Sequence, residues 1–150
     1  TSLGDLASRL APLPPTEPFS LPLLATVPDR VVGEQKLFAA TGAVHAAAAF
    51  DRSAEPLLVR EDIGRHNAVD KVVGRLLLDG RLPATGLGLF VSGRASFEMV
   101  QKAWAAGFAA VVAVSGPSSL AVETARAAGL TLAGFTRGGT LNLYSPDGPA

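Results

Sequence analysis

Cysteine is absent from this chain of 150 residues. Its absence excludes disulfide bonds, thiolate zinc sites, and a cysteine nucleophile or persulfide within these residues. Neither sign of charge is in excess, since 13 basic residues balance 13 acidic residues. A balanced chain lacks the positive surface that binding to nucleic acid or to an anionic membrane requires. We therefore expect no nucleic-acid partner and no membrane partner.

Long hydrophobic runs are also missing, and none approaches the roughly 18 apolar residues of a membrane helix. The first residues, from Thr1 onwards, do not resemble a signal peptide and include no initiator methionine, so we expect a cytoplasmic protein that is a processed or truncated piece of a longer one. Apolar side chains are abundant at 48%, and only 17% of residues are charged. This composition argues against disorder and fits one ordinary domain with a substantial core.

Proline is concentrated near the start of the chain, where residues 11–28 hold six of the 11 prolines. A segment so rich in proline cannot continue a helix and is typical of an extended connector over a surface. We expect residues 1–28 to be that connector and residues 29–150 to be the binding domain.

Short apolar runs then alternate with amphipathic segments. Helices are predicted at residues 31–40, 67–78, 96–106 and 120–128, and strands at 43–50, 56–60, 87–91, 109–114, 130–135 and 140–144. Strands that alternate with helices and are almost wholly apolar indicate a largely parallel sheet covered on both faces. The first two strands are predicted to form an antiparallel hairpin. We therefore predict a three-layer α/β/α domain with a mixed sheet.

Polar residues are concentrated in the segment EDIGRHNAVDK, residues 61–71, between a predicted strand and a predicted helix. Ligands bind at the carboxyl ends of strands in such folds, where helix N-termini present unpaired N–H groups. Arg65, His66 and Asn67 are the candidate binding residues. The alternative is a capping segment, in which Asp62 or Asn67 caps the helix and Arg65 pairs with a nearby carboxylate.

Two serine–glycine turns follow the next two strands of the parallel part. The first contains Ser92, Gly93 and Arg94, and the second contains Ser115 and Ser118. Glycine lets a backbone approach phosphate closely, and serine hydroxyls donate beside helix N-termini. Each turn alone is a common structural feature. Together with residues 61–71, the two turns favour one anion-binding crevice, although neither matches a known phosphate-loop fingerprint.

A glycine-rich segment, GFTRGGT, follows at residues 134–140. Its Arg137 either supplies a guanidinium to phosphate or is a solvated turn residue. With only His45 and His66 and no cysteine, we expect no metal site. No nucleophile, base and orienting residue can be assembled from spacing alone.

Taken together, these motifs resemble the FdhD family of formate dehydrogenase accessory proteins, which are sulfurtransferases or sulfur carriers. The segments that carry the resemblance keep their order and spacing over most of the chain. They are TGAVHAA at 41–47, EDIGRHNAVDKVVG at 61–74, SGRASFEMV at 92–100, SGPSSLAV at 115–122 and GFTR at 134–137. The resemblance implies a cytidine-deaminase-like α/β fold. Because residues 45–47 lack the His-x-Glu of zinc deaminases and there is no cysteine pair, deaminase activity is excluded.

The resemblance also implies a function in sulfur delivery. Such a protein takes persulfide sulfur from a cysteine desulfurase and inserts it into bis(molybdopterin guanine dinucleotide) molybdenum, which then goes to formate dehydrogenase. GDP or GMP would bind as fragments of this cofactor, and its two guanines would suit a homodimer. The family's cofactor-binding segment matches Phe135, Thr136, Arg137, Gly138, Gly139 and Thr140. Thr140 stands where the family commonly has a basic residue.

The family's Cys-x-x-Cys loop, which carries the persulfide, normally lies just upstream of a segment that resembles residues 1–6. The resemblance therefore implies a persulfide cysteine upstream of Thr1. We expect the chain to be the carboxyl-terminal, cofactor-binding domain of such a sulfurtransferase, able to bind ligand but not to relay sulfur. The alternative is a partner-docking or nucleotide-binding module without catalytic activity. A docking module would expose a large apolar patch instead of a polar crevice.

Overall fold

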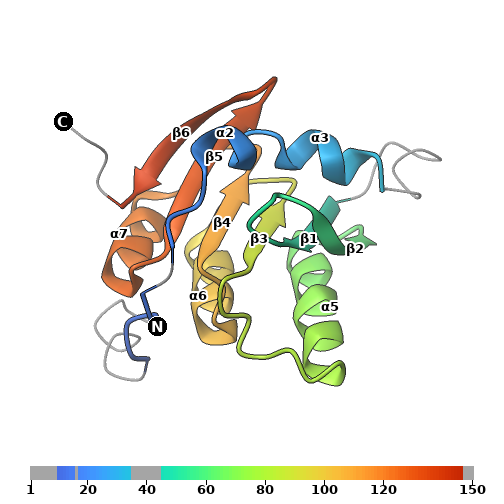
Figure 1. Cartoon of the computed structure of the whole chain (residues 1–150), viewed down its shortest axis with the longest axis horizontal. Helices are drawn as coiled ribbons and strands as arrows, with labels where there is room; N and C mark the ends of the chain where they lie inside the picture. The colour runs from blue at the N-terminus through green and yellow to red at the C-terminus, as the bar shows by residue number, and fades with distance from the viewer. Residues whose placement is uncertain (1–9, 16, 35–44, 147–150) are drawn as a thin grey trace.

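A six-stranded mixed sheet forms the centre of the protein, with the strand order β2-β1-β3-β4-β5-β6 (Figure 1). The computed structural model describes residues 10–15, 17–34 and 45–146. The strands are β1 (His45–Phe50), β2 (Pro56–Asp62), β3 (Gly88–Val91), β4 (Ala110–Ala113), β5 (Thr131–Arg137) and β6 (Thr140–Ser145). The helices are α2 (Leu21–Leu24), α3 (Val27–Val32), α5 (Arg65–Leu78), α6 (Phe97–Ala106) and α7 (Ser119–Ala128).

The directions of the strands determine which edge of the sheet carries the candidate site. β1 pairs antiparallel with both β2 and β3, while β3, β4 and β5 are parallel and β6 is antiparallel to β5. β2 therefore runs in the same direction as β3, and the carboxyl ends of β2 to β5 lie at one edge of the sheet. Each of α5, α6 and α7 follows one of these strands directly, so their N-termini lie at this carboxyl edge as well.

Two apolar cores cover the opposite faces of the sheet. One contains Val69, Val72 and Leu76 of α5 together with buried residues of α6 and α7. The other contains Leu24 of α2 and Val27 of α3. Figure 1 shows α5, α6 and α7 on one side of the strands and α2 and α3 on the other. All residues of β3 and β4 are buried, which explains why these strands are continuous apolar runs.

The helices α6 and α7 begin and end in the same way. The Ser96 hydroxyl accepts a hydrogen bond from the Met99 N–H, and the Ser118 hydroxyl accepts one from the Ala121 N–H. Each helix then ends at a glycine in the left-handed region, with φ 91° in α6 and 73° in α7. Serine caps and glycine stops therefore define two similar strand–turn–helix units.

The α/β class, the mixed sheet and the hairpin are confirmed, and most predicted elements end within two residues of the observed ones. The expectation that residues 11–28 are extended throughout is wrong, because α2 and α3 lie partly within them. Pro22 and Pro28 occupy the first turns of these helices, where a missing N–H costs nothing. The start of the predicted connector, from Thr1 to residue 9, lies outside the described residues.

The predicted helix at residues 31–40 is also wrong at its start. α3 ends at Val32, with Gly33 as its C-cap, and Asp29 lies in its first turn. Residues 35–40 lie outside the described residues. None of the helices in the described part of the chain is long and apolar enough to cross a membrane.

Two glycines provide a matched test of this packing. A Cβ atom on Gly88 would lie 2.2 Å from Cζ of the buried Phe50, whereas nothing lies within 4 Å of a Cβ atom on Gly74 in α5. Gly88→Ala should therefore lower the free energy of unfolding by about 1–3 kcal/mol through overpacking. Gly74→Ala should raise it by about 0.5–1 kcal/mol, because alanine favours a helix interior. Chemical denaturation measures both, and a Gly88→Ala protein as stable as wild type would contradict the packing described.

Candidate functional site

Neighbouring strand-to-helix turns are bonded to each other at the carboxyl edge of the sheet. Ala95 and Pro117 form an isolated parallel bridge, and the Ser118 N–H donates to the Ala95 carbonyl over 3.2 Å. The Ser115 N–H donates to the Gly93 carbonyl over 3.3 Å. The turn before α6 and the turn before α7 therefore form one surface, onto which the positive ends of two helix dipoles open.

A small cavity of about 190 Å³ lies at this edge. It is lined by Arg65, Arg94, Ala95, Ser96 and Ser118. The sequence predicts Arg65, Arg94 and Ser118 as binding residues, and the structure brings these three together. Ala95 and Ser96 were missed. The signal that would have found Ser96 is its position, because it caps α6 as Ser118 caps α7.

The arginines of this edge differ from four other cations of the described residues in their ion pairing. Arg30, Lys71, Arg75 and Lys102 all form ion pairs. Within the described residues, Arg65, Arg94 and Arg137 form none. Two exposed guanidinium groups thus line the cavity without a carboxylate partner. This arrangement suits an oxyanion, which guanidinium groups bind through several N–H donors at once.

The predicted serines have different positions. The Ser96 and Ser118 hydroxyls accept capping bonds from α6 and α7 and keep their own protons free to donate to a ligand. The Ser92 hydroxyl accepts a hydrogen bond from the Ala46 N–H over 2.9 Å, which joins the turn to β1. Ser115 uses its backbone, accepting from the Phe135 N–H. Ser92, Gly93 and Ser115 therefore lie at the same edge but outside the small cavity.

The capping interpretation of residues 61–71, in which Asp62 or Asn67 caps the helix, is wrong. The N-cap of α5 is Gly64, and no side chain caps the helix. Asp62 instead accepts hydrogen bonds from the Gly64 N–H and, more weakly, from Asn67, and it pairs with Lys71 over 2.8 Å. The Lys71 ammonium and then the Gly64 N–H lower the pKa of the Asp62 carboxyl from 3.8 to about 2. Asp62 and Asn67 thus order the loop that presents Arg65.

The two histidines lie apart from the cavity lining. His66 is half-buried in the first turn of α5, and His45 is half-buried at the start of β1. A Cβ atom on Gly93 would lie 3.8 Å from the His45 ring. Across residues 10–15, 17–34 and 45–146, no three His, Asp or Glu side chains come together as a metal site would require.

The strand β5 extends into the glycine-rich segment at 134–140, past its predicted end at residue 135. β5 continues through Arg137, and only Gly138 and Gly139 form the turn to β6, at φ 59° and 81°. Two left-handed residues are typical of a tight hairpin turn, and only glycine adopts them without strain. The Thr140 hydroxyl closes the turn by donating to the Arg137 carbonyl over 3.0 Å. Arg137 is therefore exposed at the hairpin tip, which extends past the end of β4 in Figure 1.

Phe135, at the carboxyl edge, has an unusual backbone conformation and an exposed side chain. Its φ is 50°, a conformation that residues other than glycine rarely adopt, and its side chain is 45% exposed. The next residue, Thr136, is fully buried and its hydroxyl has no partner among the described residues. Strained backbone and an unsatisfied buried hydroxyl are both costly, and such features concentrate at functional sites.

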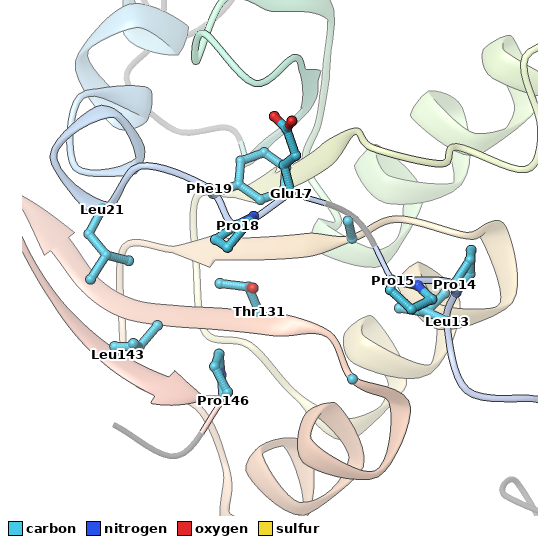
Figure 2. A pocket seen from close by; sticks show the side chains of 12 residues that line it. Leu13, Pro14, Pro15, Glu17, Pro18, Phe19, Leu21, Thr131, Leu143 and Pro146 are labelled. Carbon is cyan, nitrogen blue, oxygen red and sulfur yellow. The ribbon is translucent and has the colours of Figure 1, made fainter. Parts of the chain in front are cut away.

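A second, larger cavity lies elsewhere, between the proline-rich segment and the strands β5 and β6. Figure 2 shows prolines and leucines of both parts facing a groove of about 500 Å³. Its lining is mostly apolar: Leu13, Pro14, Pro15, Glu17, Pro18, Phe19, Leu21, Ala109, Gly129, Thr131, Leu143 and Pro146. Ala109 and Thr131 lie at the amino ends of β4 and β5, so this groove is not part of the carboxyl edge.

The fold is that of an α/β protein. At the carboxyl edge of its sheet, the turns after the parallel strands carry residues of the kind that bind ligands. The profile of the FdhD/NarQ family matches residues 3–148, and the chain belongs to that family. It is similar to the sulfur carrier protein FdhD of Nocardia farcinica, with 58% identity over 82% of this chain and 44% of the relative. It is 50% identical to that of Corynebacterium efficiens over 97% of this chain and 52% of the relative.

A solved structure supports the fold. The structure described as that of a formate dehydrogenase accessory protein from Desulfotalea psychrophila matches with a TM-score of 0.81 and 28% identity. The match covers 95% of this chain and 60% of that one. The chain spans about half the length of the curated relatives it matches, and its 150 residues contain no cysteine.

The expected position of the persulfide cysteine is a separate matter. Thr1, upstream of which the resemblance places that cysteine, lies outside the described residues. Neither the fold nor the matches to relatives test what precedes Thr1, so a cysteine there stays a prediction. The expectation that the 150 residues themselves contain no thiol nucleophile follows directly from their composition.

The strain at Phe135 predicts an unusual order of stabilities. Phe135→Gly and Phe135→Ala both remove the ring, but only glycine adopts φ 50° freely. The Phe135→Gly protein should be more stable than Phe135→Ala by about 1 kcal/mol. At the ordinary strand position Leu141 the order should reverse, because glycine weakens a strand. Chemical denaturation of the four variants tests this, and an equal or reversed order at Phe135 would contradict the strain.

The lowered pKa of Asp62 predicts a pH dependence. Its charged form stabilises the folded protein fully above pH of about 4, and this stabilisation is lost as the pH falls towards 2. Asp62→Asn should therefore have a lower Tm at neutral pH and a shallower fall in Tm between about pH 4 and 2. Thermal unfolding by circular dichroism measures both. Asp79→Asn, which removes only an exposed pair with Arg75, is the control and should change Tm little.

Proposed function

We propose that this chain is the cofactor-binding part of an FdhD sulfur carrier. It holds bis(molybdopterin guanine dinucleotide) molybdenum while sulfur from a cysteine desulfurase is transferred to that metal, for use by formate dehydrogenase. The observation that carries the proposal is the cavity at the carboxyl edge, where serine-capped helices begin and where Arg65 and Arg94 form no ion pair with any described residue. The substrate carries diphosphate groups, which are the anions this arrangement suits.

The size of the cavity limits what it holds. Its volume of about 190 Å³ is below the roughly 300 Å³ at which small-molecule pockets begin. We therefore assign the cavity to phosphate groups of the substrate and leave the larger ring systems outside it, along the edge. Ser92, Gly93 and Ser115 form this edge beside the cavity, and Phe135 continues it on β5.

The remaining predicted binding residues lie on the elements next to the cavity. Arg137 is exposed at the hairpin tip and reaches a second phosphate or the outer part of the substrate in this proposal. The turn formed by Gly138, Gly139 and Thr140 presents it, and Thr136 is buried in β5 just before it. His66 and Asn67 lie in the first turn of α5, next to Arg65.

Because these residues contain no cysteine, the proposal assigns cofactor binding and sulfur carriage to different segments. A persulfide needs a thiol, and this chain has none. In the proposed reaction the chain therefore binds and orients the molybdenum cofactor, and a thiol outside these 150 residues, upstream of Thr1, carries the sulfur. A homodimer would let each protomer take one guanine dinucleotide half, and the fold would be of the cytidine-deaminase type.

The apolar groove of Figure 2 favours a second candidate function, docking of a partner protein. Its lining of prolines and leucines suits an extended apolar segment better than a phosphorylated ligand. The two functions are compatible in one protein, since groove and cavity occupy different edges. Only the cavity predicts binding of nucleotide.

Binding of GDP, as a fragment of the cofactor, tests the proposal. Arg65→Gln and Arg94→Gln should each weaken GDP binding by about tenfold or more, since each removes charge-assisted hydrogen bonds. Arg137→Ala should weaken it less, and added salt should weaken it in the wild type. Arg81→Gln is the control, because Arg81 is exposed just beyond the far end of α5.

Isothermal titration calorimetry measures these affinities. Absence of GDP binding at millimolar concentration would contradict the proposed function and favour the docking alternative. Equal affinities for Arg65→Gln, Arg94→Gln and Arg81→Gln would contradict the assignment of the cavity.

A further inference from the structure

His45 is a half-buried residue to which the proposed function gives no role. It is the first residue of β1, and because β1 runs antiparallel to β2 and β3, it lies at the carboxyl edge. Ala47 and Ala49 of the same strand belong to the core that α5, α6 and α7 cover. Residues two positions apart in a strand share a face, so His45 lies on this helix-covered side of the sheet.

The imidazole of His45 lies between the two elements that carry the arginines of the cavity. On β2 its partner in the register is Asp62, three residues before Arg65. On the side of β3, a Cβ atom on Gly93 would lie 3.8 Å from both Cε1 and Nδ1 of the imidazole, and Gly93 directly precedes Arg94. The imidazole is therefore placed beside the cavity, outside its lining.

Two hydrogen bonds hold the backbone next to this histidine. The Ala46 N–H donates to the Ser92 hydroxyl over 2.9 Å, and the Ser92 N–H donates to the Ala46 carbonyl over 3.0 Å. The start of β1 is thereby fixed to the turn that presents Arg94. A functional side chain on a fixed strand end is held more precisely than one on a loop.

The imidazole makes no hydrogen bond with any described residue. Asp62, opposite His45 on β2, is an acceptor for other groups, since it accepts from the Gly64 N–H and pairs with Lys71. Buried polar groups that serve only the fold are usually hydrogen-bonded. In either charge state an imidazole carries at least one N–H, so His45 has a donor to offer an anion at this edge.

We propose that His45 is a further ligand-binding residue, which donates a hydrogen bond to the second phosphate of a diphosphate whose first phosphate lies between Arg65 and Arg94. This division follows from the lining of the cavity, in which those two arginines are the charged side chains. The inference rests on the proposed function and adds to it the residue that distinguishes a diphosphate from a monophosphate. A bond from an imidazole N–H to an ionised phosphate oxygen is charge-assisted, and such bonds are strong.

Calorimetry with GDP and with GMP tests the inference. GMP has one phosphate, which the arginines hold, so His45 contacts only GDP. His45→Phe keeps a flat ring without nitrogen and should weaken GDP binding about tenfold while leaving GMP binding unchanged. His45→Gln, whose amide keeps an N–H donor, should recover part of the GDP affinity. Arg81→Gln, beyond the far end of α5, is the control and should bind both nucleotides as the wild type does.

The outcomes separate the inference from the proposed function. Unchanged GDP affinity in His45→Phe, no recovery in His45→Gln, or an equal loss of GDP and GMP affinity would each overturn the inference and leave the proposed function standing. The equal loss is the result expected if His45 only shapes the neighbouring turns. A wild-type protein that binds no GDP would overturn both.

A measurement on the wild type guards against variants of His45 that do not fold. The chain contains two histidines, so its proton NMR spectrum has two sets of imidazole signals. The spectrum of His66→Gln assigns the set that belongs to His45. Saturating GDP should shift the His45 signals, and saturating GMP should shift them less. Equal shifts with the two nucleotides, or no shift with GDP, would overturn the inference.

Discussion

The candidate site depends on the close approach of adjacent turns at the carboxyl edge of the sheet. Backbone hydrogen bonds join Ala95 to Ser118, Gly93 to Ser115 and Ser115 to Phe135, so that three successive strand ends form one continuous rim. These bonds satisfy polar groups that the end of a sheet would otherwise leave unpaired. They also bring the first turns of α6 and α7 together, and with them Arg94, Ser96 and Ser118 of the cavity.

The residues around this rim differ from those of the two cores in their burial and in their backbone strain. The two cores on the faces of the sheet are apolar, and their side chains are buried. At the rim, by contrast, two arginines have no ion-pair partner among the described residues, and Phe135 has strained backbone beneath an exposed ring. Local inconsistency of this kind is expected where binding, and not stability, determines the residues.

Membership of the FdhD/NarQ family joins these features to sulfur-carrier proteins, while the composition limits what this chain contributes. Thiol chemistry needs cysteine, so in the proposed function these residues bind and orient the acceptor of the sulfur and do not carry it. The rim has the charge and the helix N-termini for that task. The apolar groove at the other edge has neither and suits contact with protein.

Several features were predictable because they depend on local sequence. The apolar runs of β3 and β4, the serine caps of α6 and α7, and the placing of Arg65, Arg94 and Ser118 at strand ends all follow from periodicity and from the direction of parallel strands. The helices α2 and α3 were missed, because proline in a first helical turn cannot be told from proline in an extended segment without its tertiary contacts. Ser96 was missed although it caps α6 as the predicted Ser118 caps α7, so comparing the two equivalent turns would have found it.

The sequence by itself thus determined the α/β class, the family and the edge of the sheet where ligand-type residues gather, since each of these depends on patterns within short segments. Only the tertiary structure decided which of those residues meet. The ring of Phe135 packs closely against Gly116, which is 19 positions away in the chain. This contact depends on the positive φ of Phe135 and on the missing Cβ atom of Gly116. Such a contact has no periodicity to reveal it, because it arises from the approach of two chain segments and not from the order of residues within either.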